Sequence, residues 1–136
     1  MLRAADEAQL LGVPLNVVCA VPPMAGAASW MPTPVDFANI YQEIADALNA
    51  SVRWLRGHFP DLEITAELLD GSPIDVLVEQ SKRNRLVVMG TRGRGGFAGR
   101  LLGSTSQGVI HNSAGPLMII QGFQDDRLAD RPEATL

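Results

Sequence analysis

The sequence contains a single cysteine and a single lysine, and both scarcities narrow the functions open to it. Cys19 lies inside an apolar run, residues 17–21, where a lone cysteine is most often a small buried hydrophobic residue. One cysteine supports neither a disulfide framework nor a cysteine-based metal cluster. Lys82 is not preceded by the Gly-x4-Gly that a phosphate-binding P-loop requires, so that class of nucleotide site is excluded.

Long apolar runs and a leader pattern are missing as well. No run is long enough to cross a bilayer, and no positively charged start precedes an apolar stretch, so the cytoplasm is the expected compartment. The net charge of −4 argues against broad binding to nucleic acid or to a membrane surface. A chain of 136 residues with 46% hydrophobic content is expected to form one domain with a real core.

Acidic residues are absent from residues 86–116, although the chain holds 15 acids in 136 residues. The same segment is rich in glycine and carries Arg92, Arg94 and Arg100. A locally cationic, glycine-rich loop in an acidic protein is what an anion site needs. From glycine and arginine alone, a flexible surface loop with arginines for solubility is the alternative.

The elements on either side of this loop favour the anion site. The apolar, partly β-branched residues 86–89 predict a buried strand before the loop. Ser104, Thr105 and Ser106 are good helix-starting residues after it. A helix N-terminus that follows a glycine loop presents unpaired N–H groups and a positive dipole end, which suits phosphate.

Hydrophobic periodicity predicts helices that alternate with strands along the chain. The helices are expected at residues 1–11, 35–58, 72–81 and 104–112, and the strands at 15–21, 62–68, 86–89 and 116–120. This alternation predicts an α/β fold, an open parallel sheet with helices on both faces. The nearly continuous apolar run 15–21 predicts a strand buried on both faces. Residues 22–34 form either a lid over a ligand or a mobile connector, and residues 124–136 are expected to be a polar, poorly ordered tail after a domain of residues 1–123.

One motif resembles a known family. The spacing Gly90-x2-Gly93-x9-Gly103-Ser104, after a strand that ends Val88-Met89-Gly90, resembles the nucleotide-binding signature of the universal stress protein family in its ATP-binding branch. The resemblance covers about residues 1–122. It implies a Rossmann-like or flavodoxin-like sheet in the order 3-2-1-4-5, ATP as ligand with Mg²⁺ as an optional companion, and a homodimer through residues 116–122, an apolar sheet edge.

The resemblance also implies a set of site residues. Adenine is expected near Ala20, Val21, Met89 and Gly90, although Val21 also suits core packing. The phosphates are expected near Gly93, Gly103, Ser104 and Thr105. The family's first strand, with the aspartate that meets the nucleotide, has no counterpart in this sequence. The sequence is therefore expected to be an N-terminally truncated form of the domain, with a strand supplied by a partner as the alternative.

The residues that other kinds of functional site require are absent from the sequence. The loose fingerprint Gly93-x-Gly95-x-x-Ala98 has no acidic residue about 20 positions on, as a dinucleotide site requires, and no Gly-x-Ser-x-Gly nucleophile elbow is present. No carboxylate pair or histidine–cysteine cluster indicates hydrolysis or a metal site. The sequence predicts a stress-response protein that binds ATP as a regulatory ligand and is not an enzyme. The alternatives are a nucleotide-independent stress protein acting by dimerisation and protein contacts, and a slow ATPase or phosphotransferase.

Overall fold

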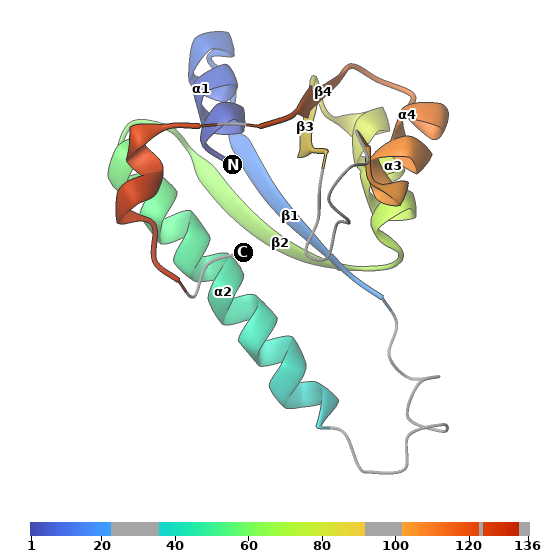
Figure 1. The fold of residues 1–136 in the computed structure, drawn as a ribbon, viewed down its shortest axis with the longest axis horizontal. Coiled ribbons are helices and arrows are strands. Elements are labelled where there is room, and N and C mark those ends of the chain that lie inside the picture. Colours follow the sequence, from blue (N-terminus) through green and yellow to red (C-terminus); the bar gives the residue numbers. More distant parts are fainter. Residues whose placement is uncertain (23–35, 92–101, 123, 134–136) are drawn as a thin grey trace.

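The computed structural model describes residues 1–22, 36–91, 102–122 and 124–133 (Figure 1). Helices alternate with parallel strands, which confirms the predicted α/β class. In chain order the elements are α1 (Leu2–Leu11), β1 (Leu15–Val21), α2 (Phe37–His58), β2 (Ile64–Asp70), α3 (Pro73–Arg83), β3 (Val87–Gly90), α4 (Ser104–Asn112), β4 (Leu117–Ile120) and the short 3-10 helix η2 (Asp126–Asp130).

Helix boundaries follow local signals in the sequence. Helix α1 ends at Gly12, whose φ of 62° lies in the left-handed region that glycine tolerates best. Helix α3 begins after Ser72, whose hydroxyl accepts the N–H of Asp75 at 3.2 Å, with Pro73 at its first position. It runs to Arg83, two residues beyond the predicted end.

The strands form two parallel pairs. Strand β1 pairs with β2 from Leu15 opposite Ile64 onward, and β3 pairs with β4 from Val87 opposite Leu117 onward. The order 3-2-1-4-5 is numbered by the family's strands, so β1 to β4 of this chain correspond to strands 2 to 5. In that numbering, the two strands of each observed pair are neighbours in the predicted order. Among the described residues, no strand lies between β1 and β3. The complete strand order therefore stays a prediction.

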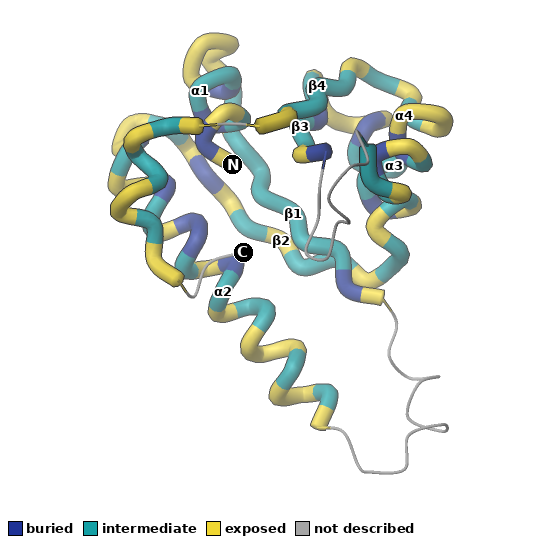
Figure 2. Tube along the Cα trace, viewed as in Figure 1, coloured by how far each residue is buried: buried dark blue, intermediate teal, exposed yellow. Residues whose placement is uncertain are grey.

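The hydrophobic core lies where α1 and α2 pack on the first strand pair (Figure 2). Its buried members come from both helices, from β2 and from the turn that follows α2; they are Leu2, Ala5, Val52, Leu55, Phe59 and Ile64. On α1 the buried residues recur every third position, as the amphipathic pattern predicts. This core holds the first strand pair in place.

Strand β1 departs from its prediction. Its apolar run predicts burial on both faces, yet only Val21 is buried and the other six residues are half-buried. The physical reason is the edge of β1 opposite β2, which borders a cavity rather than another described strand. The prediction of a fully buried strand is therefore wrong.

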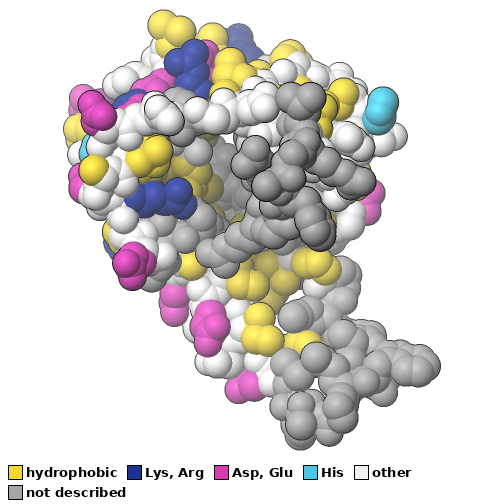
Figure 3. Space-filling model, in the orientation of Figure 1, with side chains coloured by type: hydrophobic (Ala, Val, Ile, Leu, Met, Phe, Trp, Pro, Cys, Tyr) yellow, Lys and Arg dark blue, Asp and Glu magenta, His cyan; other side chains and the backbone are white. Residues whose placement is uncertain are grey.

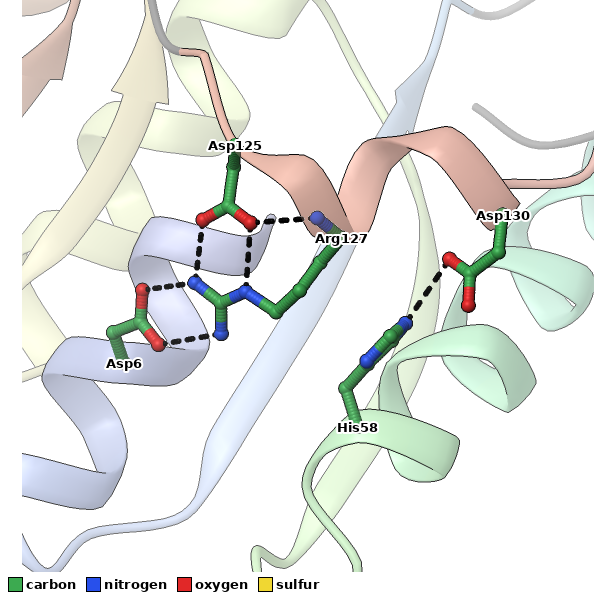
Figure 4. A network of polar contacts seen from close by, with 5 residues as sticks. All are labelled: Asp6, His58, Asp125, Arg127 and Asp130. Atoms are coloured by element: carbon green, nitrogen blue, oxygen red, sulfur yellow. Dashed lines mark hydrogen bonds and ion pairs between the residues drawn. The ribbon is translucent and has the colours of Figure 1, made fainter.

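The expectation of a poorly ordered tail is wrong for residues 124–133. Both terminal nitrogens of the Arg127 side chain on η2 donate N–H groups to the carboxylate of Asp6 on α1, each at 2.9 Å. The same side chain also donates to Asp125 (Figure 4). The indole nitrogen of Trp54 on α2 donates to Asp130 at 2.9 Å. Polar composition suggests disorder, but here the charges find partners on two helices, so η2 is docked. The boundary at residue 123 stays a prediction.

Acidification is expected to release η2. Hydrogen bonds from the Arg127 side chain lower the pKa of Asp125 from 3.8 to about 2, and the indole of Trp54 lowers the pKa of Asp130. A depressed carboxyl pKa stabilises the docked state above about pH 4, and this contribution is lost as the pH falls toward 2. The NMR signal of the Trp54 indole N–H should shift in this window.

Two variants test whether Asp125 is responsible for this pH dependence. Asp125→Asn should loosen the docking at neutral pH indirectly, because it removes the ion pair that holds the side chain of Arg127 in place beside Asp6 of α1. The neighbouring Asp126→Asn removes an equal charge from an exposed position and should leave the profile unchanged. An indole signal that stays constant from about pH 5 to pH 2 in the unmodified chain contradicts the prediction.

Candidate functional site

The end of β3 and the start of α4 form one junction. The N–H of Gly103 donates to the carbonyl of Thr91 at 2.9 Å, and the hydroxyl of Ser106 donates to the carbonyl of Gly90 at 3.1 Å. Thr91 and Ser106 are both buried. These bonds fix the helix start at the carboxyl end of a parallel strand, which is where ligands bind in open α/β sheets.

The first turn of α4 presents backbone donors that have no acceptor within the helix. Gly103 is the N-cap residue and supplies no side-chain cap, and the first intrahelical bond runs from Gln107 N–H to Gly103 C=O at 3.0 Å. The N–H groups of Ser104, Thr105 and Ser106 precede that bond, so they have no acceptor within the helix. The first turn carries no acidic side chain. Such a helix start attracts anions through its N–H groups and its dipole.

The structure brings four of the predicted site residues together. Gly90 ends β3, Gly103 caps α4, and Ser104 and Thr105 form the first turn of that helix. Met89 precedes Gly90 and is half-buried. The predicted nucleotide loop thus has a defined strand end and a defined helix start.

The remaining predicted residues lie on the other strand pair or outside the described residues. Ala20 and Val21 end β1, which belongs to the other strand pair. Val21 is buried and its carbonyl accepts the N–H of Gly71 at 2.9 Å, so it has a packing and turn role of its own. Gly93 lies outside the described residues, as do the three loop arginines and residues 23–34 of the predicted lid.

Sequence reasoning did not find the inward role of Ser106. Three hydroxyl residues after Gly103 indicate a helix start, but nothing in that pattern says which hydroxyl turns inward. The bond from Ser106 to Gly90 depends on how the helix is placed against the strand. The role of Thr91 could not be found from the sequence either, because its carbonyl becomes an acceptor only when the start of α4 lies against the end of β3.

Neither a metal-binding cluster nor a membrane-spanning helix is found in the described ranges. Within them, no three His, Cys, Asp or Glu side chains gather closely enough to hold a metal ion. Within the same ranges, the helices are too short or too polar to span a bilayer. On the face drawn in Figure 3, acidic side chains gather over α2, whose exposed residues include Glu43 and Asp46. They contrast with the first turn of α4, which has none.

Comparison with known proteins gives consistent results. The sequence model of the universal stress protein family matches residues 1–121. A universal stress protein of Mycobacterium tuberculosis is 32% identical over 136 residues, a match that covers 96% of this chain and 44% of that protein. The chain spans less than half the length of the curated relatives it matches.

Solved structures share the fold. A universal stress protein from Archaeoglobus fulgidus superposes with a TM-score of 0.67 at 27% identity, over 88% of this chain and 84% of that one. A universal stress protein in complex with cAMP superposes with a TM-score of 0.56 at 26% identity, over 90% of this chain and 87% of that one. In both comparisons most of each chain is matched.

Proposed function

The chain belongs to the universal stress protein family, and from this membership we propose that it binds ATP as a regulatory ligand in the cytoplasmic stress response. The observation that carries the proposal is the first turn of α4, with three backbone N–H groups and no acidic side chain at the carboxyl end of β3. The similar structure with bound cAMP supports a nucleotide as the ligand class.

The phosphates are proposed to lie on the N–H groups of Ser104 to Ser106, close to the Gly103 cap. With no lysine in this region, binding relies on backbone donors and the helix dipole. The adenine is proposed to lie near Met89 and Gly90, and near the end of β1 at Ala20 and Val21. Mg²⁺, where it accompanies ATP, is held mainly by phosphate oxygens, because this ion uses few protein ligands in such sites.

Calorimetry on the chain tests this proposal. ATP is expected to bind more tightly than cAMP, and cAMP more tightly than adenosine, because each added phosphate charge gains from the helix start. Adenosine binding as tightly as ATP would contradict the phosphate assignment. The absence of binding by any of the three would favour the nucleotide-independent alternative.

Efficient catalysis is not part of the proposal. Activation of water requires a positioned base, and none of the predicted site residues is a carboxylate or a histidine. Bound ATP is therefore expected to turn over slowly. Hydrolysis at ordinary enzyme rates, on the order of 1 per second or faster, would favour the ATPase alternative.

We also propose that the chain forms a homodimer through residues 116–122. Strand β4 is apolar and half-buried, and in the described structure it pairs with β3 alone. A closed symmetric dimer would cover that edge in both copies. Ile119→Lys places a charge on the strand and should weaken the dimer by about tenfold or more.

Light scattering at micromolar concentration measures this effect. Ile110→Lys is the matched control, because Ile110 lies on α4 and is already 43% exposed. The control should keep the mass of the unmodified chain. A monomeric mass for the unmodified chain, or a dimer that persists with Ile119→Lys, contradicts the dimer proposal.

A further inference from the structure

The short helix η2 connects the second strand pair with the helices of the first. It follows β4 after residues 121–125, so its chain comes from the second strand pair. It lies beside α1 and α2, the helices that pack on the first strand pair (Figure 1). Among the described strands, no hydrogen-bonded ladder joins the two pairs. The docked η2 is therefore a tie between two parts of the molecule.

The docking of η2 on α1 depends on one arginine. Both terminal nitrogens of Arg127 donate to the carboxylate of Asp6 at 2.9 Å, and Asp125 accepts from the same guanidinium at 2.6 Å. The guanidinium also lies over the ring of Phe59, 5.4 Å from its centre. The side chains of Arg127 and Asp6 are only 33% and 30% exposed, so water screens this bidentate pair less than a fully exposed one. Loss of Arg127 should therefore release η2 from α1.

The docking of η2 on α2 depends mainly on Trp54. The carboxylate of Asp130 accepts the indole N–H at 2.9 Å and lies 3.2 Å from Nε2 of His58. The guanidinium of Arg131 lies 6.0 Å from the centre of the Trp54 ring, and Leu128 packs against the hydrophobic core. Figure 4 shows α1 on one side of η2 and α2 on the other. The segment is thus held from both sides by other elements.

Helix η2 contributes little to its own order. Its backbone bonds include those from the N–H of Leu128 to the carbonyl of Asp125 at 3.0 Å and from the N–H of Arg131 to Leu128 at 3.2 Å. A helix of five residues has too few internal bonds to be stable alone. The segment therefore has two states, docked and released, and the contacts with α1 and α2 set the balance between them.

The proposed nucleotide site has one half in each part of the molecule. The first turn of α4 and the end of β3 at Gly90 belong to the second strand pair, whereas Ala20 and Val21 end β1 in the first. A ligand that contacts both halves binds most tightly when the two parts are already held in one arrangement, because binding then costs less entropy. The tie need not contact the nucleotide to raise its affinity.

We propose that the docking of η2 is coupled to ATP binding, so that the docked segment raises ATP affinity and bound ATP favours the docked segment. This inference rests on the proposed function and names a regulator of the same site. Because a coupling free energy is reciprocal, the two effects have the same size. Helix η2 lies beyond residues 1–121, the part that matches the family model, so the coupling concerns this chain and not the family as a whole.

Calorimetry on Arg127→Ala measures the first effect. The variant loses the ion pairs with Asp6 and Asp125, so ATP affinity should fall about fivefold or more, as for a typical coupling between two sites. Arg53→Ala is the matched control, because it removes the same charge from an exposed position on α2 and should keep the affinity of the unmodified chain. The NMR signal of the Trp54 indole N–H reports in each chain whether η2 is docked.

Hydrogen exchange on the unmodified chain measures the second effect. The amide of Leu128 is bonded within η2 and exchanges when the segment is released, so saturating ATP should slow its exchange about fivefold or more. The amide of Gly12, bonded to Gln9 at the end of α1, opens locally and should keep its rate. This measurement does not depend on the stability of any variant.

The outcomes separate the coupling from the ATP site itself. Equal ATP affinity in Arg127→Ala and the unmodified chain, with an indole signal that shows release, overturns the coupling and leaves the proposed ATP binding intact. So does a Leu128 exchange rate that ATP does not change. An equal loss of affinity in Arg53→Ala overturns the coupling too, because charge alone would then explain the effect. If the unmodified chain binds no ATP, the proposed function and this inference fail together.

Discussion

Gly103→Val is expected to weaken ATP binding by about tenfold or more, because each charge-assisted hydrogen bond lost costs about 1.5–3 kcal/mol. Gly103 caps α4 and its N–H is bonded to the carbonyl of Thr91. A side chain here would lie at the helix start, beside the N–H groups of the first turn that are proposed to bind phosphate. Its first carbon would lie 3.2 Å from that same carbonyl, which is a tight contact.

The fold should tolerate this change. The φ of Gly103 is −74°, a value open to any residue, so no left-handed strain arises. Replacing a glycine N-cap by an apolar residue costs about 1 kcal/mol. Gly57→Val is the matched control, because a side chain at Gly57 meets no atom within 4 Å and α2 lies outside the proposed site.

Calorimetry and thermal unfolding measure the two effects separately. The expected result is lost affinity with a melting temperature lowered by only about 3–5 °C, and unchanged affinity in the Gly57→Val control. Full ATP affinity in Gly103→Val would contradict the phosphate assignment. Equal loss in both variants would point to a general loss of stability.

Local chemistry explains why most of the fold could be predicted. The end of α1 before Gly12 and the start of α3 after Ser72 depend only on neighbouring residues, and both lie within one residue of the predicted bounds 1–11 and 72–81. The failures depend on distant contacts. The burial of β1 depends on what lies beside its edge, and the order of residues 124–133 depends on Asp6, more than a hundred residues away.

For the candidate site too, the local features could be predicted and the long-range contacts could not. The spacing from Gly90 to Ser104 marks the strand end and the helix start, and the structure places both at one junction. The buried bond from Ser106 to Gly90 could not be predicted, because it requires the position of one element relative to another. Gly93 lies outside the described residues, so its phosphate role stays a prediction.

Gly115→Ala is expected to lower the free energy of unfolding by about 1–3 kcal/mol, the usual cost of overpacking. A side-chain carbon at Gly115 would collide with the backbone carbonyl oxygen of Ser81. Ser81 is buried near the end of α3, and its hydroxyl accepts the N–H of Ala114 at 3.0 Å while donating to Val78 at 2.7 Å. The turn before β4 is therefore seated against α3 without room for a methyl group.

Gly108→Ala is the matched control for this substitution. The three atoms nearest to its added carbon all belong to the side chain of Ile74, which can change rotamer, whereas a backbone carbonyl cannot move without displacing α3. Alanine in place of a helical glycine also gains about 1 kcal/mol. Thermal unfolding should therefore show a clear loss for Gly115→Ala and little change for Gly108→Ala. Equal melting temperatures for the two variants would contradict the packing argument.

The loss at Gly115 should extend to β4 itself. The carbonyl of Pro116, the next residue, accepts the N–H of Val87 at 3.0 Å and starts the pairing of β4 with β3. Moving the turn away from Ser81 displaces that carbonyl, so the amide of Val87 should exchange faster in Gly115→Ala. The amide of Leu15, bonded to Glu63 in the other strand pair, should keep its protection. Equal acceleration at both amides would indicate global unfolding rather than a displaced turn.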